Sequence, residues 1–268
     1  MVSESRSTAR NHHLERSKHA YPPLALVTGA NKGIGLQIAK DLAAQGFEVL
    51  IGARKLGLGV AAARSLRGDS QAIQLDVTDQ SSITAAARQI ENTWGRLDVL
   101  INNAGISRPI KLGTPANEMR DGDKVSRAIV DDMRLVFETN VFGVVAVTQA
   151  MLPLLRKAPA ARIVNVSSAG GSLTLKDDPS DYSRQYVGVY QTSKTALNAI
   201  TQAFAIELEG TGIKVNAVSP GFTATDLSNH APRAGAVEDA AREPVRLALL
   251  DTNGPTGTFS NATGPLPW

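Results

Sequence analysis

The chain has 268 residues, and 43% of them are hydrophobic, which is enough to bury the core of one α/β domain. It contains no cysteine, which excludes disulfides, thiolate nucleophiles and cysteine-based zinc sites. The net charge of +3 falls to 24 − 23 = +1 once the first 22 residues are set aside, and aromatic residues make up only 4%. We therefore expect no nucleic-acid partner and no membrane-surface partner.

Residues 1–22 are polar and carry three of the four histidines, His12, His13 and His19. They lack the apolar segment of a secretory signal, so we expect a disordered N-terminal extension before a single domain at 23–268. His230 is the one histidine in that domain. A Ser-His-Asp triad or a multi-histidine metal site would depend on it alone, so we expect no metal. No apolar run reaches the roughly 18 residues of a membrane span, and we expect a cytoplasmic protein.

From Leu24 onward, short apolar runs alternate with longer amphipathic stretches, which is typical of βα units that build a parallel sheet. Several runs are apolar on both faces, as strands covered by helices on both sides should be. The predicted strands are 24–28, 48–53, 72–76, 99–102, 163–166, 213–218 and 256–260. The predicted helices are 34–45, 81–93, a long helix ending near residue 155, and 190–209.

A glycine-rich turn joins the first predicted strand to the first predicted helix, and it reads Thr28-Gly29-Ala30-Asn31-Lys32-Gly33-Ile34-Gly35. Gly29 permits a tight turn, Gly33 lets backbone amides approach phosphates, and Gly35 allows close helix packing. Three glycines alone are weak evidence, but a strand before them and a helix after them favour a pyrophosphate site. The sequence therefore predicts one Rossmann-type domain, a doubly wound parallel seven-stranded α/β sheet.

Tyr190 and Lys194 begin the last long predicted helix, four residues apart and on the same helical face. A nearby cation favours the phenolate, so we expect the pKa of Tyr190 to fall from about 10 towards neutrality. That pKa suits a general acid or base acting on a carbonyl or alcohol oxygen. Taken alone, such a pair is more often an ordinary solvated helix face.

Taken in chain order, these motifs resemble the short-chain dehydrogenase/reductase family over about residues 23–268. The others that carry the resemblance are Asn102-Asn103-Ala104-Gly105, Asn140, Ser167-Ser168 and Pro220-Gly221. The ending Gly254-Pro255-Thr256-Gly257…Pro267-Trp268 and Asn31-Lys32 look more like the carbonyl-reductase branch. The resemblance implies reduction of ketones or aldehydes to alcohols by direct hydride transfer, without a covalent intermediate.

The resemblance also assigns roles to residues. Tyr190 would donate a proton to the substrate oxygen, and Ser168 rather than Ser167 would hydrogen-bond that oxygen. Lys194 would hold the nicotinamide ribose, and Asn140 would anchor a water in a proton relay. The other cofactor-binding residues it implies are Gly29, Asn31, Lys32, Gly33, Ile34 and Gly35 at the phosphates, Asp76 and Val77 at the adenine, Asn103, Ala104 and Gly105 near the adenosine ribose, and Pro220, Gly221, Phe222, Thr223 and Thr225 at the carboxamide.

The charge after the second strand decides which cofactor we expect. NAD sites usually place an acidic residue there, on the ribose 2′-hydroxyl. Here Arg54-Lys55 follows the strand without a carboxylate, and Lys32 would meet Arg54 over the same ribose. Two cations favour a 2′-phosphate, so we expect NADP(H); the alternative is that both are merely exposed basic side chains.

Two long segments flank the expected pocket. The stretch 173–186 makes the spacing from Ser168 to Tyr190 longer than is usual in the family, and it predicts a surface excursion near the pocket. In the family, longer insertions here mark monomeric carbonyl reductases, and members without one usually form dimers or tetramers. This insertion is intermediate in length, so a monomer and a homo-oligomer both remain open. The predicted loop 106–125 offers candidates for the substrate entrance: Pro109, Thr114, Met119 and Arg120.

Two other functions remain open besides carbonyl reduction. An alcohol dehydrogenase working mainly in oxidation would use the same residues, since direction follows the cofactor ratio. A non-catalytic NADP(H)-sensing protein is disfavoured, because degenerate sensors usually lose the tyrosine or the lysine and this chain keeps both. The expected partner is a small carbonyl or alcohol substrate.

Overall fold

The computed structural model describes residues 22–108, 124–185, 187–228 and 233–268. Three sequence expectations fall on residues outside these ranges. They are the N-terminal extension, the candidate entrance residues of the loop 106–125, and the environment of His230.

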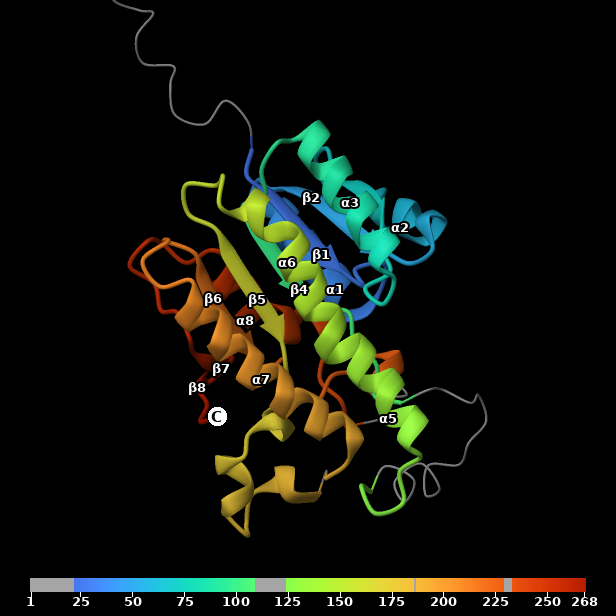
Figure 1. The fold of residues 1–268 in the computed structure, drawn as a ribbon, viewed down its shortest axis with the longest axis vertical. Coiled ribbons are helices and arrows are strands. Elements are labelled where there is room, and N and C mark those ends of the chain that lie inside the picture. Colours follow the sequence, from blue (N-terminus) through green and yellow to red (C-terminus); the bar gives the residue numbers. More distant parts are fainter. Residues whose placement is uncertain (1–21, 109–123, 186, 229–232) are drawn as a thin grey trace, which may run out of the picture.

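Eight strands form one sheet in the order β3-β2-β1-β4-β5-β6-β7-β8 (Figure 1). Neighbours from β3 to β7 are parallel, and β8 is antiparallel to β7. The predicted parallel seven-stranded sheet is confirmed, with an eighth strand too short to predict from its two residues. The strands are β1 (Leu24–Thr28), β2 (Glu48–Ala53), β3 (Gln71–Gln74), β4 (Val99–Asn102), β5 (Arg162–Val166), β6 (Lys214–Val218), β7 (Phe259–Asn261) and β8 (Gly264–Pro265).

The strand order reverses direction between β1 and β4, which lie side by side at the centre of the sheet. In their register Val27 pairs with Ile101, so both strands end at the same level. Ligands of open α/β sheets bind outside the carboxyl ends of the strands at such a reversal. The glycine turn after β1 and Asn103 after β4 therefore lie at the expected cofactor crevice.

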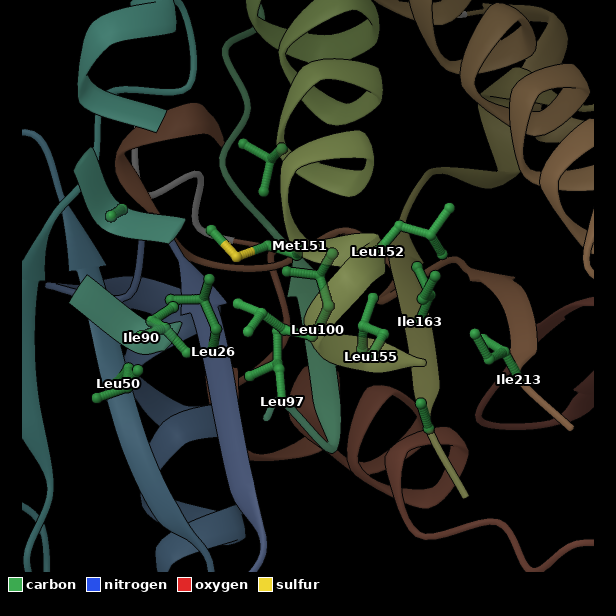
Figure 2. Close-up of a cluster of buried hydrophobic side chains, with 14 of the residues drawn as sticks. Leu26, Leu50, Ile90, Leu97, Leu100, Met151, Leu152, Leu155, Ile163 and Ile213 are labelled. Carbon is green, nitrogen blue, oxygen red and sulfur yellow. The ribbon is translucent and has the colours of Figure 1, made fainter. Parts of the chain in front are cut away.

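Helices cover both faces of the sheet (Figure 1). On one face Val27 and Ile51 lie in a buried cluster with residues of α1 (Gly33–Ala44), α2 (Leu56–Ala63) and α8 (Val237–Ala248). On the other face the cluster includes residues of α3 (Gln80–Thr93), α6 (Gly143–Leu155) and α7 (Val189–Glu207). Figure 2 shows Met151 and Leu155 of α6 packed beside Leu97 and Leu100. These two apolar layers hold the sheet rigidly beneath the crevice.

A single helical stretch from Val130 to Leu155 contains α5 (Val130–Phe137), a π-helical turn (Glu138–Phe142) and α6. Its 26 residues, with a mean hydropathy of 1.5 in the most apolar window, are long and apolar enough to cross a membrane. This differs from the sequence expectation, which considered only uninterrupted apolar runs. Half of that window is buried, and Val147, Met151 and Leu155 are fully buried in the core, which accounts for its apolar character.

Candidate active site

Three positions of the glycine turn after β1 require glycine, two because of their backbone conformation and one because a side chain has no space. Gly29 and Gly33 have φ values of +64° and +58°, in the left-handed region. A Cβ on Gly35 would lie 2.4 Å from Asn103 Nδ2 and 2.9 Å from the Gly29 oxygen. The side chain of the N-cap residue Lys32 makes no capping bond to α1, so this helix N-terminus has the donors and the dipole that an anion requires. The turn therefore fits a pyrophosphate.

Asn103 fastens this turn to the end of β4. Its Nδ2 donates to the Thr28 main-chain oxygen at 2.9 Å, and the N–H groups of Asn103 and Ala104 both donate to Thr28 Oγ1 at 3.0 Å. A Cβ on Gly29 would lie 3.0 Å from Ala104 Cα. The structure thus brings two of the predicted cofactor-binding segments together, and it gives the Asn103 amide a positioning role.

The segment after β6 contacts the same turn. A Cβ on Gly33 would lie 3.5 Å from Thr225 Cγ2, and Lys32 forms an ion pair with Asp226, both side chains being largely exposed. Thr223 is buried and its Oγ1 donates to the Gly221 oxygen at 3.1 Å. Sequence reasoning missed Asp226, because nothing local marks a partner 194 residues away from Lys32.

The remaining predicted cofactor residues follow β2 and β3. Arg54 directly follows β2 and is exposed. The end of β2 is bonded to the glycine turn, because the Ala30 N–H donates to the Gly52 oxygen at 3.1 Å. The Asp76 carboxylate accepts from the N–H and the Oγ1 of Thr78 at 3.0 and 2.8 Å. Val77 is buried in the core cluster, so its side chain packs in the protein interior.

Tyr190 and Lys194 share the first turns of α7. The Lys194 ammonium is buried, donates to the Val166 oxygen at 2.7 Å, and lies 5.6 Å from the centre of the Tyr190 ring. Burial lowers the pKa of Lys194 to about 8 and raises the pKa of Tyr190 to about 12. The expected lowering of the Tyr190 pKa is wrong for this arrangement, because desolvation of the phenolate outweighs an ammonium that faces the ring.

Asn140 lies in the π-helical turn and is fully buried. Its Oδ1 accepts from the Ile106 N–H at 2.9 Å, and its Nδ2 donates to the Ile106 oxygen at 2.8 Å and to Ser193 Oγ at 3.0 Å. Such π-turns recur at functional sites, where they re-aim side chains. Because protein groups engage both ends of the amide, the anchoring of a relay water stays a prediction.

Ser193 is a residue that sequence reasoning missed. It is fully buried, and its Oγ accepts from Asn140 and donates to the Tyr190 main-chain oxygen at 2.6 Å. It thereby connects the π-helical turn to the start of α7. The sequence could have indicated Ser193 by its position three residues after Tyr190, on the same helical face as Tyr190 and Lys194.

The two serines after β5 have different environments. Ser167 is buried, and its Oγ donates to Asn198 Oδ1 at 2.5 Å. Ser168 is half-buried, and its Oγ accepts from the Gly170 N–H at 3.2 Å. The proton of Ser167 is therefore engaged inside the protein, whereas Ser168 can still donate to a ligand. No group of three or more histidine, aspartate and glutamate side chains suited to a metal ion occurs in the described part of the chain.

Comparison with known proteins places this geometry in a family. The family model described as short chain dehydrogenase matches residues 23–234. A short-chain dehydrogenase of Penicillium roqueforti is 38% identical over 84% of this chain and 88% of its own length. (−)-Isopiperitenone reductase of Mentha piperita is 34% identical over 88% of this chain and 95% of its own length.

Among solved structures, the NADPH-bound carbonyl reductase from chicken fatty liver superimposes with a TM-score of 0.76. It is 29% identical, and the match covers 92% of this chain and 99% of that one. The family match spans β1 to the segment after β6, which includes the glycine turn, Asn140, Ser168, Tyr190 and Lys194. The chain therefore belongs to the short-chain dehydrogenase/reductase family of oxidoreductases, which use nicotinamide cofactors.

Proposed function

We propose that the protein is an NADPH-dependent reductase of ketones or aldehydes in which Tyr190 is the general acid. The observation that carries the proposal is the position of the Lys194 ammonium between the cofactor crevice and the phenol. A Cβ on Gly105 would lie 3.7 Å from Lys194 Nζ, and the same atom lies 5.6 Å from the Tyr190 ring centre. The solved structure named as an NADPH-bound carbonyl reductase supports a carbonyl substrate.

Four segments of the chain would hold the cofactor. The N–H groups at the start of α1 would bind the pyrophosphate, Asn103 to Gly105 would lie beside the adenosine ribose, and Asp76 and Val77 would receive the adenine. Pro220 to Thr225 would hold the carboxamide. The bond to Val166 uses one of the three N–H donors of Lys194, and the other two suit the hydroxyls of the nicotinamide ribose. When bound, the reduced nicotinamide supplies the hydride.

The proton comes from the protein. With a pKa of about 12, Tyr190 remains protonated across the neutral range, so it can donate to the substrate oxygen as the carbonyl carbon is reduced. The Ser168 hydroxyl donates a second hydrogen bond to that oxygen and stabilises its developing charge. The Lys194 ammonium then stabilises the phenolate that proton donation leaves.

The preference for NADPH rests on Arg54 and Lys32. No carboxylate follows β2 to accept from a ribose 2′-hydroxyl, and Arg54 is exposed beside the turn. The Lys32–Asp226 pair is exposed, and pairs of this kind contribute about 0–1 kcal/mol, so Lys32 can exchange Asp226 for a phosphate at little cost. An NADPH-oxidation assay over ketones, aldehydes and quinones tests the proposed activity, and the absence of turnover on every carbonyl would exclude it.

The Arg54→Asp variant should narrow or reverse the cofactor preference. For the unaltered protein we expect kcat/KM to favour NADPH over NADH by about one to three decades, or roughly 1.4–4 kcal/mol, from charge-assisted phosphate contacts. The measurement is the ratio of the two kcat/KM values. Arg64→Asp, with the same charge change at the far end of α2, is the control and should keep the ratio. Equal use of both cofactors by the unaltered protein would contradict the argument.

The pH dependence of reduction should report Lys194. Its cationic form is present below about pH 8 and is lost as the pH rises through that value, so kcat/KM for NADPH should fall above about pH 8. In Lys194→Arg, which stays protonated, the falling limb should move to higher pH even if the rate is lower. A limb that stayed near pH 8 in the arginine variant would belong to another group.

A further inference from the structure

The far end of the described chain folds back onto the loop that follows Ser168. The main-chain oxygen of Trp268 accepts from Ser172 Oγ at 3.1 Å and from the Thr174 N–H at 3.0 Å. The Trp268 ring stacks on Phe259 of β7, with ring centroids 5.6 Å apart and planes inclined by 18°. Phe259 is itself buried, in the strand between β6 and β8. We call these four residues the Trp268 clamp.

The clamp holds the point where the 173–186 insertion begins. Ser172 is fully buried, and besides donating to Trp268 its Oγ accepts from the Leu175 N–H at 3.0 Å. That bond starts the first turn of the insertion, at Thr174–Asp177. Leu173, the first residue of the insertion, is 63% exposed, and Leu175 and Lys176 after it are half-buried. The base of the insertion thus depends on a residue 96 positions away from Ser172.

The same base is packed against the catalytic helix. Thr195 Oγ1 donates to the Gly171 oxygen at 2.8 Å, and a Cβ on Gly171 would lie 2.8 Å from the Lys194 carbonyl carbon. A Cβ on Gly170 would lie 3.0 Å from Gln191 Cγ. The loop from Ser168 to Ser172 therefore lies between α7 and Trp268, with no space on the α7 side. The segment that contacts Trp268 at Ser172 therefore begins at Ser168.

We propose that Trp268 is a positioning residue that sets which carbonyl substrates the site accepts, an inference that rests on the proposed function. The insertion leaves the site after Ser168 and returns to it before Tyr190. An exposed apolar side chain lies at each end: Leu173 is the first residue of the insertion, and Val187 directly follows its last residue. These side chains suit the apolar body of a bulky ketone, whereas a small aldehyde needs only the groups at the reacting oxygen. When the Trp268 clamp fixes the base of the insertion, these apolar side chains stay in position to contact a bulky ketone, and the site favours that substrate over a small aldehyde.

The test compares Ser172→Ala and Trp268→Ala with the unaltered protein on a bulky apolar ketone and a small aldehyde, both with NADPH. Both variants should lower the ketone-to-aldehyde ratio of kcat/KM by at least about fivefold, Ser172→Ala through the lost Oγ hydrogen bond to Trp268 and Trp268→Ala through the lost ring stacking on Phe259. The loss should come mainly through KM for the ketone, and the NADPH Kd should stay within about twofold. Thr263→Ala removes an exposed bond in the β7–β8 turn and should change none of these values.

Amide hydrogen exchange of peptides spanning 170–178 supplies a readout that does not depend on activity. The N–H groups of Thr174 and Leu175 should exchange faster in Ser172→Ala, because both lose support from the clamp. Faster exchange with an unchanged substrate ranking would overturn the proposal, and so would equal losses on both substrates and on NADPH affinity. If the unaltered protein reduces no carbonyl at all, the proposed function fails first and this inference fails with it.

Discussion

Replacing Tyr190 by phenylalanine should lower kcat for carbonyl reduction by at least about a hundredfold, the usual effect of losing a general acid. The NADPH Kd should change little, because the aromatic ring and the neighbouring Lys194 ammonium remain, and only the O–H is removed. Steady-state kinetics give kcat, and a fluorescence titration with NADPH gives the Kd. The split between the two values separates a lost acid from a disturbed cofactor site.

Thr192→Ala is the matched control for this variant. Thr192 lies in the same helical turn as Tyr190, but its side chain is exposed and donates to the Gly188 main-chain oxygen. We expect kcat within a few-fold of the unaltered protein for this control. Substantial turnover by Tyr190→Phe would mean that another group donates the proton, and it would remove the central assignment of the proposed function.

The two serines after β5 should respond in opposite ways to replacement by alanine. Ser168→Ala should lower kcat by about 10²–10³-fold, the effect of removing one donor to a developing oxyanion, without loss of stability. Ser167→Ala breaks a buried bond and leaves Asn198 Oδ1 without that donor, so it should cost about 1–3 kcal/mol of unfolding free energy. Its kcat should stay within a few-fold, because Ser167 faces the core.

Kinetics and denaturant unfolding of the same two preparations decide between the serines. A large loss of kcat in Ser167→Ala with intact stability would reverse their roles. Equal kinetic losses in both variants would show that the loop after β5, and not one hydroxyl, determines the rate.

The sheet was predictable from local patterns, and particular elements show why. Strands β1, β2 and β4 begin and end at the predicted residues, because runs such as Leu24–Thr28 are apolar on both faces and bounded by glycine or polar residues. Helices α2 and α8 were absent from the prediction. Two of the eight residues in α2 are glycine, and α8 contains Pro244, which local rules treat as breaks in a helix. Packing on the sheet outweighs both signals.

The candidate site was predictable as a set of residues but not as a set of environments. The spacing of Tyr190 and Lys194 places them on one helical face in any α-helix, and three glycines between a strand and a helix require an open turn. The pKa values of Tyr190 and Lys194 depend instead on burial, which spacing does not reveal. For that reason the expected shift of Tyr190 had the wrong direction.

The sequence by itself determined the family, the order of the strands along the chain, and the residue types at the end of each one, since these follow from short-range periodicity and motif spacing. Only the tertiary structure decided which distant groups meet. Lys32 finds Asp226, Asn140 reaches Ser193, and Trp268 holds Ser172 across separations of 194, 53 and 96 residues. Such partners are determined by the packing of the whole sheet and its helices, because that packing sets which donor lies within reach of which acceptor.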